Sequence, residues 1–271
     1  MSSAADGEPR PAFIPRDCHA HTTFSDGALT PRAAVAAARA RGVRPGIADH
    51  ISRDISRSVS GPDAVVRYLD ALDALDEPDL ARGGEFCWHD DLWRELPLAT
   101  LDRFTHRVGS LHAIFLADGT RVHMFQRDLP GDLEAQDYMD AHVAELERFA
   151  ATMPVDILAH PTLLPIPLRG YPLEDLWTEA REERAVDALA RAGICFEVSA
   201  RYRPHERFVR RAHAHGVRIS LGSDGHLPEQ VGNLAWPLAL VTAVGVPLDT
   251  LYDPLVHGSR PASSYAGART R

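Results

Sequence analysis

Short apolar runs alternate with amphipathic stretches over most of this chain. Apolar runs bounded by turn residues are typical of buried strands, and apolar positions spaced three and four residues apart are typical of helices. The strands that we predict are 13–21, 43–50, 82–88, 105–112, 155–160, 193–199 and 217–224. The helices that we predict are 31–41, 62–76, 132–152, 174–192 and 204–215. This alternation indicates an α/β fold of about seven strand–helix units in one domain, close to a barrel with one unit missing or distorted.

The ends of the chain lack this pattern. Residues 1–12 and 258–271 are rich in small and polar residues, so we expect flexible tails around a folded domain at 13–257. The N-terminus has no apolar run of the signal-peptide kind. The longest apolar tract, Leu234–Leu248, contains two prolines and is shorter than the roughly 20 residues that a membrane helix needs. We therefore expect no membrane association.

Composition narrows the choice of partners and compartment. The 271 residues include 29 Lys+Arg and 38 Asp+Glu, a net charge of -9, and no basic stripe is visible. This argues against nucleic acid as a partner. The 3 cysteines are odd in number and form no C-x-x-C pair, which is typical of reduced thiols in a cytoplasmic protein. The unusual feature is the 14 histidines.

A pair of histidines stands at the end of the first predicted strand. In the run Asp17-Cys18-His19-Ala20-His21, His19 and His21 project to the same face, because alternate residues of a strand share a face. Paired imidazoles suit a divalent metal better than a core. Asp26 follows in the next loop, within reach of the same cleft.

Similar residues recur where later strands end. With the first three, the set comprises His19, His21, Asp26, His50, Glu85, His112, His160, Asp224 and His226. Active sites of α/β barrels are assembled at the carboxyl ends of their strands, and burying so many ionisable groups without metals would be costly. The pattern therefore predicts a metal-dependent enzyme.

The ordered motifs HAHTTFSDG, IADH, VGSLH, ILAHP and GSDGH resemble those of the PHP (polymerase and histidinol phosphatase) family over most of the chain, about residues 17–226. The resemblance implies a distorted (β/α)7 TIM-like barrel and a phosphoesterase with two to three divalent ions of zinc, manganese or iron. By position, it implies one ion held by His19, His21, Glu85 and Asp224, a second by Asp26, His50 and His226, and a third by Glu85, His112 and His160.

Two parts of the sequence depart from the family pattern. The strand reading FEVSARYR lacks the Asn that relatives often carry after the Glu. The segments 86–106 and 162–183 are idiosyncratic, and we expect these loops to shape substrate choice.

The chemistry that we expect is hydrolysis of a phosphomonoester by a hydroxide that bridges the metal ions, with no covalent intermediate. Asp224 or His226 would orient the nucleophile or protonate the leaving oxygen. Arg201 is our candidate for binding phosphate, and Arg169 is its rival, because guanidinium groups match phosphate oxygens.

Other acidic residues and histidines of the sequence are not predicted to bind metal directly. Asp17 and Asp49, each close to a ligand histidine, are candidates for fixing imidazole tautomers, and charges at strand ends are the equal alternative. His142, His213 and His215 are interpreted as residues of solvated helix faces.

Several functions remain open from the sequence. The favoured one is a small-molecule phosphatase, with histidinol phosphate or a nucleotide as substrate. The alternatives are a nuclease acting on nucleic-acid ends, a metallohydrolase of non-phosphate substrates, and a non-catalytic module of a larger assembly. Retention of all the ligand types in one chain argues against the last of these.

Overall fold

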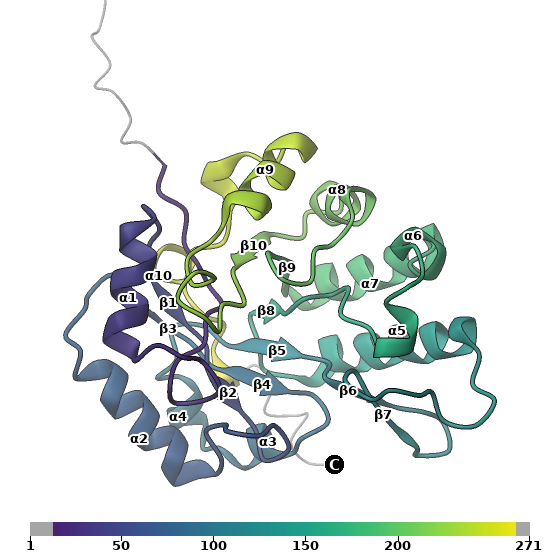
Figure 1. The fold of residues 1–271 in the computed structure, drawn as a ribbon, viewed down its shortest axis with the longest axis horizontal. Coiled ribbons are helices and arrows are strands. Elements are labelled where there is room, and N and C mark those ends of the chain that lie inside the picture. The colour runs from purple at the N-terminus through teal and green to yellow at the C-terminus, as the bar shows by residue number, and fades with distance from the viewer. Residues whose placement is uncertain (1–12, 264–271) are drawn as a thin grey trace, which may run out of the picture.

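The computed structural model describes residues 13–263, which are built around a parallel sheet with strand order β10-β9-β8-β5-β4-β2 (Figure 1). Its strands are β2 (His50–Ile51), β4 (Glu85–Cys87), β5 (Val108–Ser110), β8 (Ile157–Leu158), β9 (Cys195–Ser199) and β10 (Ile219–Gly222). A second parallel pair, β1 (Gly46–Ile47) and β3 (Ala81–Arg82), precedes β2 and β4 along the chain. An antiparallel pair, β6 (Ala113–Phe115) and β7 (Arg121–His123), projects beyond the sheet.

The segment predicted as the first strand, 13–21, lies between β10 and the chain that follows β1. On one side the Cys18 amide donates to the Leu221 carbonyl at 2.9 Å. On the other side the Ala48 amide donates to the Ala20 carbonyl at 2.9 Å. The pairing consists of isolated bridges rather than a continuous ladder. The segment therefore joins β10 to the residues around β1.

Helices surround the strands, with α1 and α2 on the left of Figure 1 and α5 and α7 on the right. The longer ones are α1 (Pro31–Ala40), α2 (Pro62–Asp73), α5 (Ala135–Thr152), α7 (Glu179–Ala192), α8 (Glu206–Ala214) and α9 (Ala235–Val244). The shorter ones are α3 (Leu92–Glu95), α4 (Leu98–Leu101), α6 (Leu173–Leu176) and α10 (Pro254–His257). Each predicted helix has a counterpart, so the mixed α/β class with a parallel sheet is confirmed.

The helix boundaries follow from local chemistry. Thr30 accepts a hydrogen bond from the Ala33 amide and Pro31 opens α1, as predicted. The single helix predicted at 174–192 is instead divided into α6 and α7. Thr178 between them caps α7 by accepting from the Arg181 amide, which restarts the helix there.

The expectation of a solvated helix face is wrong for His142. This residue lies on the inner side of α5, 2% exposed, with its Nδ1 3.2 Å from the Tyr138 hydroxyl and its ring edge-on to Trp177. Burial lowers the pKa of its imidazole to about 4, so it packs as a neutral ring.

Residues 1–12 and 264–271, which we expected to be flexible, lie outside the described residues. The part of the second segment that is described packs against the domain. Ser259 Oγ and the Arg260 amide donate to the carboxylate of Asp156 at 2.7 and 2.9 Å, and Ala262 is fully buried. The packed chain therefore continues beyond residue 257.

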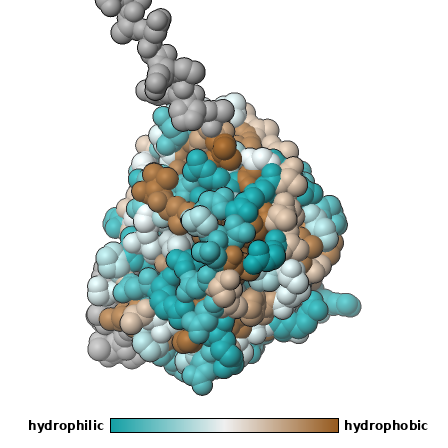
Figure 2. Space-filling view, turned by 90° about the vertical axis from the view of Figure 1, so that its left-hand side faces the viewer, coloured by the Kyte–Doolittle hydropathy of each residue, from teal (hydrophilic) through white to brown (hydrophobic). Residues whose placement is uncertain are grey.

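No helix within residues 13–263 is long and apolar enough to cross a membrane. The face of the molecule seen in Figure 2 is mostly hydrophilic, and its hydrophobic residues form separate small patches.

Removal of residues 258–271 should lower the melting temperature. The fully buried guanidinium of Arg107 would lose its contact to Ser259 Oγ, 2.8 Å away, and Asp156 would lose two donors. Each buried polar group left without a partner costs about 1–3 kcal/mol. Thermal unfolding followed by circular dichroism measures the effect. Deletion of only 264–271 is the control, and equal melting temperatures for the two truncated proteins would contradict the prediction.

Candidate metal centre

The predicted ligands meet in one place, at the first residues of β2 and β4 and just beyond the ends of β5, β8 and β10. His50 and Glu85 are partners in register on β2 and β4. His112 follows β5 and His160 follows β8. Asp224 and His226 follow β10, next to the segment that carries His19 and His21. Because parallel strands present their carboxyl ends at one edge, residues far apart in the sequence converge there.

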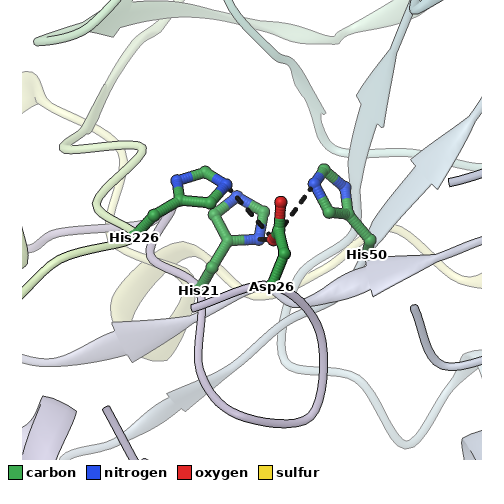
Figure 3. Close-up of side chains that lie close together, drawn as sticks. All are labelled: His21, Asp26, His50 and His226. Carbon is green, nitrogen blue, oxygen red and sulfur yellow. Dashed lines mark ion pairs between the residues drawn. The ribbon is translucent and has the colours of Figure 1, made fainter. Parts of the chain in front are cut away.

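Three imidazoles surround one carboxylate oxygen (Figure 3). Asp26 Oδ1 lies 3.2 Å from His226 Nε2, 3.6 Å from His50 Nε2 and 3.9 Å from His21 Nδ1. This oxygen is buried and has no hydrogen-bond partner among the described residues. Ring nitrogens and a carboxylate oxygen around one point are a ligand set that suits zinc and other transition metals.

Glu85 lies at the centre of a larger cluster. Its Oε2 is 2.6 Å from His50 Nδ1 and 3.5 Å from His19 Nε2. Its Oε1 is 3.1 Å from His160 Nε2 and 3.4 Å from His112 Nε2. The two oxygens of this fully buried carboxylate therefore face different histidines, an arrangement that lets one carboxylate bridge two ions.

A close contact between two ring nitrogens also fits a cation at this site. His19 Nε2 and His21 Nε2 are 3.1 Å apart, and Asp224 Oδ1 is 3.3 Å from the same nitrogen of His21. Two imidazole lone pairs that face one another repel unless a proton or a metal ion lies between them.

Burial and neighbouring charges keep several of the predicted ligands in the protonation state that binds metal. Burial, with the neighbouring His50, lowers the pKa of His21 to about 3, and burial also holds the pKa of His112 well below its ordinary value. Burial alone would raise the pKa of Glu85, but the adjacent histidines, His50 foremost, outweigh it and hold that pKa well below its usual range. The imidazoles of His21 and His112 are therefore neutral and the Glu85 carboxylate is ionised near neutral pH.

Two ligand positions have strained backbones. His160 has a φ of 30° and Asp224 a φ of 49°, both in the left-handed region that favours glycine. Each such residue costs about 1–3 kcal/mol, and strain of this kind is concentrated at functional sites.

Glu197 contacts the cluster and was missed in the sequence. Its Oε1 is 2.8 Å from His19 Nδ1, and its Oε2 accepts from the His160 amide at 2.6 Å. The available signal was an acidic residue within the buried apolar strand CFEVS, where an ionisable side chain needs a partner.

The hypothesis that Asp17 and Asp49 fix imidazole tautomers is wrong. Asp17 accepts from the Ser223 amide, the Ser223 hydroxyl and the Gly232 amide at 2.6–2.9 Å. Asp49 accepts from Thr22 and from the Ser25 hydroxyl. These carboxylates therefore hold the loops that carry Asp224 and Asp26, rather than the imidazoles themselves.

The cluster forms the floor of a cleft with a volume of about 360 Å³. Besides the ligands, its lining residues are Asp54, Ile55, Ser56, His123, Phe125, Arg201 and Tyr202. None of these belongs to segments 86–106 and 162–183, which were expected to shape substrate choice. In those segments Trp93 and Trp177 are buried in the core instead.

The two candidate arginines differ in where they point. Arg201 lines the cleft, with Nη1 2.8 Å from His226 Nδ1 and 3.9 Å from Asp224 Oδ1. Arg169 donates to the carbonyls of Leu164 and Met124 and does not line the cleft. Only Arg201 of the two is therefore placed to meet a ligand above the cluster.

Comparisons with known proteins identify the fold. No protein-family model and no curated protein matches the sequence. The structure is similar to that of histidinol phosphate phosphatase from Lactococcus lactis, solved with zinc, L-histidinol and phosphate. The TM-score is 0.66 at 14% identity, over 85% of this chain and 94% of that chain. It is also similar to a protein of Listeria monocytogenes assigned provisionally as a histidinol phosphatase. Here the TM-score is 0.64 at 15% identity, over 80% of this chain and 97% of that chain. At these identities the likeness establishes a shared fold.

The replacement Glu85→Gln should remove bound divalent metal. The amide keeps the size of the side chain but removes the charge that faces His50, His19, His112 and His160. We expect two to three ions per chain in the wild-type protein and at least one fewer in the variant, measured by elemental analysis after dialysis. Fewer than two ions in the wild-type protein would refute a cluster of this size.

Proposed function

We propose that this chain is a metal-dependent phosphatase that hydrolyses small phosphomonoesters. The observation that carries the proposal is the convergence of nine His, Asp and Glu side chains, seven of which line one cleft beside Arg201. The fold shared with histidinol phosphate phosphatase from Lactococcus lactis supports it. Histidinol phosphate and nucleotides are the substrates to test first.

We further propose that the catalytic domain, predicted at 13–257 and extended by the packed residues 258–263, is a distorted seven-stranded barrel of the PHP type. The segment around Cys18 supports this, because its backbone is hydrogen-bonded to Leu221 on one side and its neighbour Ala20 is bonded to Ala48 on the other. These two hydrogen bonds connect β10 to the chain between β1 and β2.

The three cysteines are free and buried, which supports a reducing, cytoplasmic location.

The ligand sets proposed for the ions follow the observed clusters in part. Glu85 would bridge, since its oxygens face His19 on one side and His112 and His160 on the other. Asp26, His50 and His226 form a compact group, and His21 lies within reach of that group as well as of His19. Zinc, manganese and iron all accept such mixed nitrogen and oxygen ligands.

Divalent ions bound here would activate water for attack and neutralise part of the charge on a phosphoryl group. Arg201 would orient the phosphate by donating from its guanidinium, which is directed at the cleft. Asp224 is held ionised, because the hydrogen bond from His21 and the nearby histidine charges outweigh the effect of burial on its pKa. Asp224 would therefore stay an ionised hydrogen-bond acceptor that could orient the attacking water. His226, more exposed than Asp224 and next to Arg201, would lie beside the leaving oxygen and help to orient it.

The direct test is turnover of phosphate esters. The purified protein, supplied with manganese, iron or zinc, should release phosphate from p-nitrophenyl phosphate and from at least one member of a panel that includes histidinol phosphate and nucleotides. His19→Ala and Asp224→Ala should each lower kcat/KM by at least about 10²-fold, because each removes a metal-facing group. Their circular dichroism spectra should match that of the wild-type protein. An untouched panel, or full turnover by either variant, would refute the proposal.

Loss of the Arg201 guanidinium should weaken substrate binding. We expect Arg201→Ala to raise KM or lower kcat/KM by roughly 10-fold or more, since a hydrogen bond to a charged group contributes about 1.5–3 kcal/mol. Arg203→Ala is the matched control, because Arg203 lies two residues away, against Trp236, and does not line this cleft. Equal kinetic constants for the wild-type protein and Arg201→Ala would remove Arg201 from the site.

A further inference from the structure

Glu197 occupies a position behind the metal-facing surface of the cluster. It lies within β9 and is fully buried. One oxygen is 2.8 Å from His19 Nδ1 and the other accepts from the His160 amide at 2.6 Å. Both partners belong to the proposed centre, but Glu197 lies on the far side of each from the cleft, whose lining does not include it.

The absence of a side chain at Gly222 leaves the space that the Glu197 carboxylate occupies. A Cβ atom at Gly222, on the neighbouring β10, would lie 2.2 Å from Glu197 Oε1 and 2.9 Å from His19 Cβ. Any larger residue would therefore displace the contact between the two side chains. The backbone of His160, with its φ of 30°, presents its amide to the other oxygen.

These contacts determine which ring nitrogen of His19 is left free to bind a metal ion when the imidazole is neutral. An ionised carboxylate only accepts hydrogen bonds, and the His160 amide only donates. His19 Nδ1 must therefore carry a hydrogen to bond with Glu197 Oε1. In a neutral imidazole this leaves the lone pair on Nε2, the nitrogen that faces Glu85 Oε2 at 3.5 Å and His21 Nε2 at 3.1 Å.

We propose that Glu197 is a positioning residue that sets the tautomer of His19 and the orientation of His160, and so prepares two ligands of the metal centre with one carboxylate. The inference rests on the proposed function, since it assumes that divalent ions bind at the cluster. Carboxylates in this relation to a ligand histidine also make the imidazole a stronger ligand.

The isosteric change Glu197→Gln separates size from hydrogen-bonding character. The Gln oxygen must face the His160 amide, because that group always donates. The Gln amino group then faces His19 Nδ1, which can only accept from it if the hydrogen moves to Nε2. A protonated Nε2 cannot bind a metal ion, so the variant should fold normally but bind metal weakly.

The experiment is a competition of each apo-protein with a chelator for Zn²⁺. We expect Glu197→Gln to weaken the affinity of at least one ion by about 10–100-fold, with an unchanged melting temperature in the presence of the chelator. Glu145→Gln is the matched control, since Glu145 is a buried glutamate that accepts from Trp88 Nε1 and pairs with Arg148 away from the cluster. It should bind Zn²⁺ as the wild-type protein does.

The ¹⁵N NMR signals of His19 in the zinc-loaded wild-type protein provide a second test that needs no variant. We expect a hydrogen on Nδ1 and zinc on Nε2. A hydrogen on Nε2, or equal zinc affinities of the wild-type protein and Glu197→Gln, would overturn the role of Glu197 while leaving the metal centre intact. Absence of zinc binding by the wild-type protein would instead overturn the metal centre, and this role with it.

Discussion

The structure depends on the burial of many ionisable groups at one edge of a parallel sheet. Glu85 is fully buried and has histidine nitrogens around both of its oxygens. Burying a single charge costs several kcal/mol unless it is paired. Pairing among the side chains compensates only part of this, because Asp26 Oδ1 and Glu85 Oε2 have no hydrogen-bond partner among the described residues. Divalent cations would compensate the carboxylate charge and would also separate ring nitrogens that are now in contact.

A set of buried carboxylates that do not face the cleft holds this arrangement in place. Asp17 binds the loop that carries Asp224, and Asp49 binds the loop that carries Asp26. Glu197 binds one ligand through its ring and another through its backbone. Their acceptors are filled by backbone amides, hydroxyls and an imidazole, so the ligand geometry is largely established by the chain itself. Metal affinity would therefore depend on residues that no ion would touch.

The sequence predicted those residues of the cluster whose positions follow from the periodicity of strands. The spacing of His19 and His21, and the recurrence of His, Asp and Glu at the ends of apolar runs, identified the residues that the structure brings together. Glu197 was missed because its partners lie far away in the sequence and only pairing of the strands places them beside it. His142 was misassigned because a helical pattern does not say which polar residue is covered by Trp177 from another segment. Contacts of this kind are set by tertiary packing.

The walls of the cleft do not come from the two segments that were expected to shape substrate choice. The walls of the cleft come from Asp54 to Ser56, from His123 and Phe125 near the β6–β7 hairpin, and from Arg201 with Tyr202. The two idiosyncratic segments support these walls from behind.

In the first of these segments, His89 Nε2 is 2.9 Å from Asp54 Oδ2. In the second, the Arg169 guanidinium packs on the rings of Phe125 and Tyr202. Changes in these segments would therefore alter substrate preference by moving the walls, whereas changes at Ile55 or Phe125 would alter the surface that the organic part of a phosphate ester meets. If the ions and Arg201 hold the phosphoryl group as proposed, discrimination between one ester and another would fall to these wall residues.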